Sequence, residues 1–176
     1  MEIWRNKLCT KKRCVYYARL SWKLLNIFYN GLATTAVLAR NYKREVVGAE
    51  TYLFKDVADS FMAETRAYER ALVFAHKMGF QRLAVEGDAL SVIKNIRNRE
   101  AGKSIIRPII YNIHQLDRKF EEVIYTFVPR EVNEAAHVLP IEGRRKGVGQ
   151  NWVNDVLDLV QTVVRKDWIA LEQKSQ

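Results

Sequence analysis

The chain has 176 residues, 48% of them hydrophobic, and a formal net charge of +9. This length is typical of one domain, and the apolar content is sufficient for a folded core, so the composition excludes a chain that is disordered throughout. No apolar stretch approaches the roughly 18–20 residues of a membrane span, and the N-terminus lacks the apolar core of a secretory signal. We expect an intracellular protein of the nucleus or cytoplasm, with an organelle as the alternative, and no membrane partner.

The positive charge is concentrated near the N-terminus. Residues 1–30 contain seven Lys or Arg residues against one acid, a net charge of +6, whereas residues 31–140 contain sixteen basic and fourteen acidic residues. We interpret residues 1–22 as a basic N-terminal arm, which is typically solvated. Because the remainder is nearly neutral, a polyanionic partner has to be inferred from motifs rather than from net charge.

The predicted elements alternate along the chain. Five segments have the apolar runs or alternation of β-strands, namely residues 24–30, 34–40, 45–54, 82–87 and 123–128. Helical spacing is found at residues 60–78, 89–99 and 105–120, and Asn133 is placed to cap a further short helix. The predicted fold is therefore α/β, with a mixed five-stranded sheet of three antiparallel and then two parallel strands, flanked by helices.

Local signals set the limits of the first long helix and of the domain. Asp59 or Ser60 is expected to cap that helix, and Gly79 is expected to end it. We assign residues 23–142 to the α/β domain. Residues 143–176 are assigned to a linker and a C-terminal amphipathic helix, which the apolar spacing places at 151–172.

Two carboxylates are candidates for a functional site. Glu64 falls on a side of the long helix that should pack inward, and Asp88 directly follows the strand at 82–87. The residues that share this side of the helix with Glu64 are Ala67, Tyr68, Ala71, Ala75 and Met78. Because a buried charge is costly without a partner, a cation held by Glu64 and Asp88 is one solution. Pairing of Glu64 with a neighbouring arginine and a helix-capping role for Asp88 are the alternatives.

Three short motifs occur in a characteristic order. They are Ala63-Glu64 in the long helix, Glu86-Gly87-Asp88 after the fourth strand, and Val128-Pro129-Arg130-Glu131 with Asn133 before the last short helix. Over about residues 24–142 the chain resembles the ribonuclease H family, most closely the plant ribonuclease H-like domains of the type 1, reverse-transcriptase-like kind. The resemblance implies four carboxylates that hold two Mg²⁺ ions at the RNA strand of an RNA–DNA hybrid. It assigns Glu64 and Asp88 as two of these metal ligands and as catalytic residues.

The chain departs from the family pattern at the other two metal ligands. Tyr29 or Asn30 stands where the family has its first Asp, and His137 stands where it has its last. Asn30 offers a neutral oxygen and His137 a nitrogen, but neither restores the negative charge, and imidazole suits Mn²⁺ better than Mg²⁺. Losing one residue that merely supports a metal ligand costs roughly 10–100-fold in affinity or activity, so we expect reduced or lost catalysis.

Five residues are candidates for contact with nucleic acid. Arg130 and Asn133 belong to the last motif. Lys94, Arg97 and Lys103 cluster around the connection between two predicted helices, where cations can follow phosphates. A solvated surface is the alternative for these three cations, and a helix cap is the alternative for Asn133.

These observations lead to three hypotheses. The first is a ribonuclease H-like domain that binds RNA–DNA hybrid or RNA and has an incomplete metal site, a possible pseudoenzyme in which any activity would use Mg²⁺ or Mn²⁺. The second is an active hybrid ribonuclease that recruits Glu86 or Glu134 as a substitute ligand, although Glu86 is otherwise expected to be a surface carboxylate. The third is a non-catalytic scaffold for protein contacts.

Overall fold

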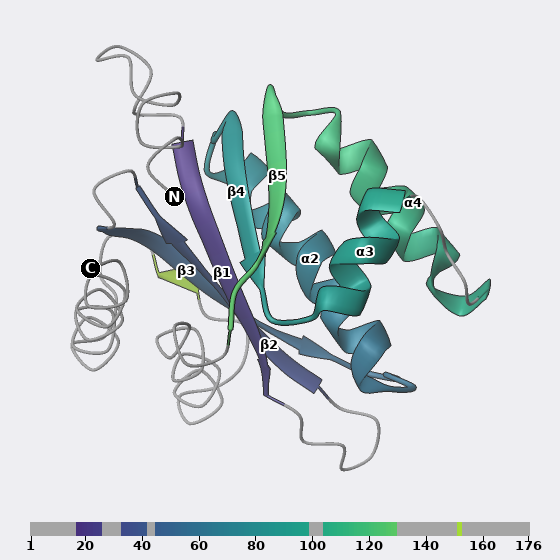
Figure 1. Cartoon of the computed structure of the whole chain (residues 1–176). Coiled ribbons are helices and arrows are strands. Elements are labelled where there is room, and N and C mark those ends of the chain that lie inside the picture. Colours follow the sequence, from purple (N-terminus) through teal and green to yellow (C-terminus); the bar gives the residue numbers. More distant parts are fainter. Residues whose placement is uncertain (1–16, 26–32, 42–44, 99–103, 130–150, 153–176) are drawn as a thin grey trace.

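A six-stranded mixed sheet organises the part of the chain that the computed structural model describes, which comprises residues 17–25, 33–41, 45–98, 104–129 and 151–152 (Figure 1). The strands are β1 Tyr17–Leu25, β2 Ala33–Arg40, β3 Val46–Phe54, β4 Arg82–Gly87, β5 Glu122–Phe127 and β6 Asn151–Trp152. Their order in the sheet is β5-β4-β1-β2-β3-β6. β1, β4 and β5 are parallel, whereas β2 and β3 form an antiparallel hairpin beside β1. The predicted mixed sheet is confirmed, and β6 extends it by one short strand.

The first strand lies earlier than the sequence pattern predicted. β1 is Tyr17–Leu25, whereas we expected residues 24–30, and residues 26–32 lie outside the described part. Its sequence alternates polar residues with four apolar ones, Ala18, Leu20, Trp22 and Leu24, which is the period of a strand. β1 therefore begins inside the predicted basic arm, and two of the N-terminal cations, Arg19 and Lys23, belong to a strand.

The start of the predicted C-terminal helix is instead a strand. Asn151–Trp152 forms β6 and pairs antiparallel with Ala49 and Glu50 of β3. This pairing satisfies backbone hydrogen-bonding groups along the outer edge of β3. Helical spacing in the sequence gives no information about such long-range pairing. The rest of the predicted helix, residues 153–172, lies outside the described residues.

Helix α2 begins and ends where the sequence predicted. It spans Ser60–Lys77, and the Asp59 side chain caps it by accepting a 2.8 Å hydrogen bond from the Met62 backbone N–H. Gly79 follows the helix with a φ of +76°, and its N–H donates to the carbonyl of His76 at 3.1 Å. Only glycine adopts this left-handed conformation without a steric cost, so it ends the helix efficiently.

The helices lie together on one face of the sheet (Figure 1). After α2 they are α3 Leu90–Asn98, the 3-10 helix η2 Ser104–Ile106 and α4 Arg107–Asp117. The main core fills the space between helices and sheet, and its buried residues include Val37, Tyr68, Leu72, Leu83, Val85, Ile93, Ile96, Ile113 and Tyr125. None of the described helices is long and apolar enough to cross a membrane.

Candidate metal and nucleic-acid site

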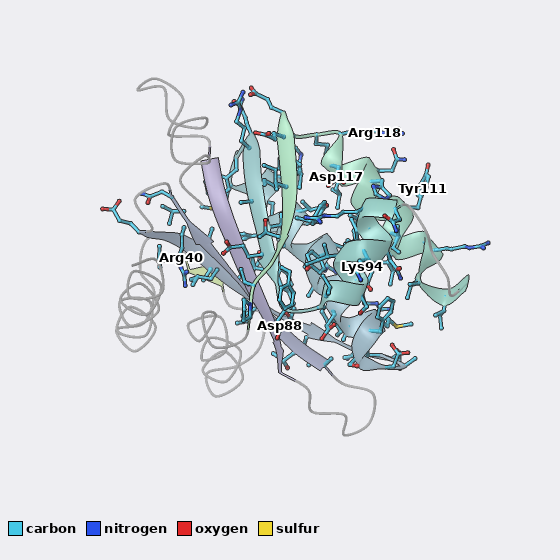
Figure 2. The ribbon with its side chains drawn as sticks, in the orientation of Figure 1. Arg40, Asp88, Lys94, Tyr111, Asp117 and Arg118 are labelled. Atoms are coloured by element: carbon cyan, nitrogen blue, oxygen red, sulfur yellow. The ribbon has the colours of Figure 1, made fainter. Side chains whose placement is uncertain are left out.

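Asp88 lies in the turn that joins β4 to α3. β4 ends at Gly87, which pairs with Phe127 of β5, and the Val128 N–H donates to the Gly87 carbonyl at 3.0 Å. Asp88 is half-buried, and Figure 2 shows it at the end of the sheet where β4 leads into the helices. The position of its backbone is therefore fixed by strand pairing on one side and by α3 on the other.

Glu64 projects from the inward side of α2, as predicted. Of the five residues expected on the same side, Ala67, Tyr68, Ala71 and Ala75 are fully buried and Met78 is partly buried. Glu64 itself is half-buried and lies in the second turn of the helix. Its helix position is stable, since Asp59 caps the N-terminus.

The topology brings Glu64 and Asp88 to the same end of the sheet. A short turn joins the end of α2 to the start of β4, so helix and strand run in opposite directions. From Glu64 to Lys77 the helix rises about 20 Å at ~1.5 Å per residue. From Arg82 to Asp88 the strand also rises about 20 Å at ~3.3 Å per residue. The two carboxylates therefore lie at a similar height, beside the carboxyl end of β4.

Two further chain segments start from this edge. β1 and β5 flank β4 and run parallel to it, so all three strands have their carboxyl ends at the same edge of the sheet. Ligands of sheets with this architecture bind outside the carboxyl ends of parallel strands. Most of the remaining predicted site residues follow β1 or β5 in the chain, and their positions are outside the described residues: Tyr29, Asn30, Arg130, Asn133, Glu134 and His137.

Comparison with known proteins identifies the family. The sequence model of the reverse transcriptase-like family matches residues 28–141. The chain belongs to this family. It is thereby a member of the ribonuclease H-like superfamily, as the three motifs predicted. Comparison with the curated proteins found no match.

Solved ribonucleases H share the fold of this ribonuclease H-like chain. RNase H1 of the archaeon Halobacterium salinarum superposes with a TM-score of 0.68 at 21% identity, covering 74% of this chain and 99% of its own. The N-terminal RNase H domain of a Mycobacterium tuberculosis protein superposes with a TM-score of 0.66 at 19% identity, covering 74% of this chain and 95% of its own. LC11-RNase H1, solved in complex with an RNA/DNA hybrid, superposes with a TM-score of 0.64 at 16% identity, covering 73% of this chain and 97% of its own.

Glu86 is buried in this ribonuclease H-like domain, so the expected surface position is wrong. Its exposed fraction is 9%. β4 lies between β1 and β5, and Glu86 is flanked by Ser21 and Thr126 in the neighbouring strands. The sequence pattern shows which residues alternate along a strand but does not show that the strand is central, which is why burial on this side was missed. Among the described residues, no three His, Cys, Asp or Glu side chains gather as a metal site.

The candidate cations on α3 differ from each other in their surroundings. Lys94 is exposed, and Figure 2 shows it on the helical side of the domain. Arg97 is also exposed, but its guanidinium donates a short hydrogen bond to the backbone carbonyl of Tyr125 in β5. Arg97 therefore has a structural contact that the sequence did not predict. Lys103 lies outside the described residues.

A partly buried network joins β5 to the end of α4. The Tyr125 hydroxyl donates to Oδ1 of Asp117 at 2.5 Å, and Nδ1 of His114 lies 3.5 Å from Oδ2 of the same carboxylate. The Tyr125 ring also meets the Tyr68 ring edge-on, with centroids 5.8 Å apart. Burial raises the pKa of Tyr125 well above its ordinary value, and the negative charge and hydrogen bond of Asp117 raise it further. The network fixes the strand that ends beside Asp88.

Proposed function

We propose that this ribonuclease H-like chain binds RNA–DNA hybrids and cleaves their RNA strand weakly or not at all. The argument that supports the proposal is that the directions and lengths of α2 and β4 place Glu64 and Asp88 at the same end of a ribonuclease H-like sheet. The presence of an RNA/DNA hybrid in the complex of LC11-RNase H1, which has the same fold, supports this class of ligand.

The two carboxylates fit a divalent cation of the Mg²⁺ or Mn²⁺ kind. Both are half-buried, and a cation bound by both carboxylates would further stabilise their negative charge. Carboxylate oxygens are the donors that Mg²⁺ prefers. Glu64 and Asp88 would therefore hold the ion, which when bound supplies charge stabilisation at a phosphate and activates water.

The chain's own residues provide position and charge at this site. α2 holds Glu64 through the packing of its inward side, and the bond between Val128 and Gly87 holds the turn that carries Asp88. Two fixed carboxylates are sufficient to attract a cation and, through it, a phosphate. By resemblance the family uses four, and Asn30 and His137 supply no negative charge at the other two positions. Because two negatively charged metal ligands are missing, we expect the chain to retain binding but to lose most or all of its catalytic activity.

Binding and cleavage of a labelled RNA–DNA hybrid test the proposal. We expect the full chain to bind the hybrid with an affinity that falls as salt rises, because phosphate contacts release counterions. We expect cleavage to be more than about 100-fold slower than in an enzyme with a complete ligand set, since two ligands are replaced. Glu64→Gln and Asp88→Asn should remove any residual cleavage.

Glu69→Gln is the matched control for these variants. Glu69 lies on the same helix but accepts a 3.0 Å hydrogen bond from Asn112 of α4, away from the site. Rapid Mg²⁺-dependent cleavage that Glu64→Gln abolishes and Glu69→Gln spares would overturn the loss of catalysis and favour substitute ligands. Absence of hybrid binding would overturn the proposal as a whole and favour a protein-interaction scaffold.

A further inference from the structure

Phe127 and Leu90 leave an apolar patch exposed beside Asp88. The exposed fraction is 44% for Phe127 and 46% for Leu90. Phe127 lies opposite Gly87 in the sheet, and Leu90 is the first residue of α3, which packs against β5. Two of the large hydrophobic side chains that are exposed in the described part thus flank the turn that carries Asp88.

The position of Phe127 is fixed although its side chain is exposed. Val123 and Tyr125, which precede it on the same side of β5, pack into the main core. The backbone is held on both sides of Phe127, by the Arg97 contact to the Tyr125 carbonyl and by the bond from Val128 to Gly87. Because the backbone is held and a phenylalanine side chain has only two rotatable bonds, covering the ring with a ligand costs little conformational entropy, which favours binding.

On the α3 side the charge next to this patch is positive, whereas the turn beside it carries the carboxylate of Asp88. Lys94 follows Leu90 by one helical turn and Arg97 follows by two, so the three lie along one side of α3. The nine residues of this helix include no Asp or Glu. An aromatic surface bordered by cations suits a nucleic-acid strand, with the base on the ring and the phosphates near the lysine.

We propose that Phe127, supported by Leu90 and Lys94, stacks an unpaired nucleotide of a single-stranded extension that leaves the hybrid at the candidate site. The inference rests on the proposed function and specifies part of its substrate. Bases inside a duplex are stacked on each other and do not expose their faces, whereas unpaired bases stack readily on aromatic side chains. The patch therefore distinguishes an extended hybrid from a blunt one.

Fluorescence anisotropy with the full chain tests this preference. The probes are a blunt RNA–DNA hybrid and the same hybrid with a short single-stranded extension on either strand. We expect the extended hybrid to bind about tenfold more tightly, the usual effect of one stacked base. Phe127→Ala should abolish the difference and leave the affinity for the blunt hybrid unchanged, whereas Phe127→Trp should keep it.

Two further variants separate stacking from folding and from general surface effects. Phe127→Leu keeps an apolar side chain for packing but not the aromatic ring, so it should also lose the preference. Tyr111→Ala removes another exposed aromatic residue, on α4, and should preserve it. Equal affinity of the wild type for both hybrids, or a preference that survives Phe127→Leu, would overturn this inference while the proposed function stands. Failure to bind either hybrid would overturn both.

Discussion

Arg97 of α3 donates a hydrogen bond to the backbone carbonyl of Tyr125 in β5. β5 is the strand at one end of the sheet order, so its outer backbone groups have no neighbouring strand within the described part. Unpaired groups at a sheet edge invite association with other chains. Arg97 covers one of them and ties α3 to the strand that ends beside Asp88.

We therefore expect Arg97 to contribute to stability more than to nucleic-acid binding. Arg97→Ala should lower the free energy of unfolding by about 1.5–3 kcal/mol, the usual contribution of a hydrogen bond from a charged group. Arg97→Lys should recover part of it, since a lysine retains a charged donor. Chemical denaturation measures the change, and Lys94→Ala is the control because Lys94 is an exposed cation on the same helix. Equal stability of the two alanine variants would contradict the structural role.

Tyr125 should make the protein less stable in alkaline solution. Burial and Asp117 raise its pKa in the folded state, so the hydroxyl stays protonated there when an unfolded tyrosine ionises. The stabilisation is complete below about pH 10, the ordinary pKa of tyrosine. It falls by about 1.4 kcal/mol per pH unit above that value, until the folded-state pKa is reached.

Urea denaturation on both sides of this pH, with Tyr125→Phe as the comparison, measures the effect. The variant should lose about 1.5–3 kcal/mol at neutral pH, because it lacks the hydrogen bond to the charged Asp117 carboxylate. Its stability should decline less steeply in alkaline solution than that of the wild type. Tyr52 also has a raised pKa, through burial and its hydrogen bond to Glu50, so part of the decline should remain. Parallel curves for the two proteins would rule out the role assigned to Tyr125.

The cap of α2 offers a test on the helix that carries Glu64. Asp59→Ala removes the acceptor of the Met62 N–H and should cost about 1 kcal/mol of stability. Asp59→Ser preserves an oxygen at the cap and should cost much less. Thermal unfolding compares the variants, and an alanine variant as stable as the serine variant would show that the cap does not stabilise this helix.

Most of the fold was predictable because its signals are local. The caps at Asp59 and Gly79 and the alternation at residues 82–87 depend on residues close in sequence. The prediction for β1 was wrong because the apolar run at residues 24–30 resembles a strand, although the regular alternation from Ala18 to Leu24 is the better strand signal. β6 was missed because its pairing with β3 is long-range and a two-residue strand has no pattern of its own.

The candidate site was predictable only in part. Glu64 and Asp88 could be named from motifs, and the strand and helix lengths then explain why they lie at the same height. Burial of Glu86 depends on the central position of β4, and the contact of Arg97 depends on how α3 crosses β5. Exposure of Phe127 also depends on the tertiary arrangement, because Tyr125 is the last residue on that side of β5 that packs into the core. None of these three properties follows from residue type or local spacing.

Divalent ions should stabilise the protein through Glu64 and Asp88 whether or not it cleaves RNA. A ligand that binds only the folded state stabilises it by RT ln(1 + [L]/Kd), which is about 2.7 kcal/mol at a hundredfold excess over Kd. We expect Mn²⁺, and more weakly Mg²⁺, to raise the melting temperature of the wild type. Glu64→Gln and Asp88→Asn should each remove most of this increase, since one carboxylate alone holds the ion poorly, while Glu69→Gln should retain it. A melting temperature that neither ion changes, or an increase that survives in both site variants, would show that these two carboxylates do not form a metal site.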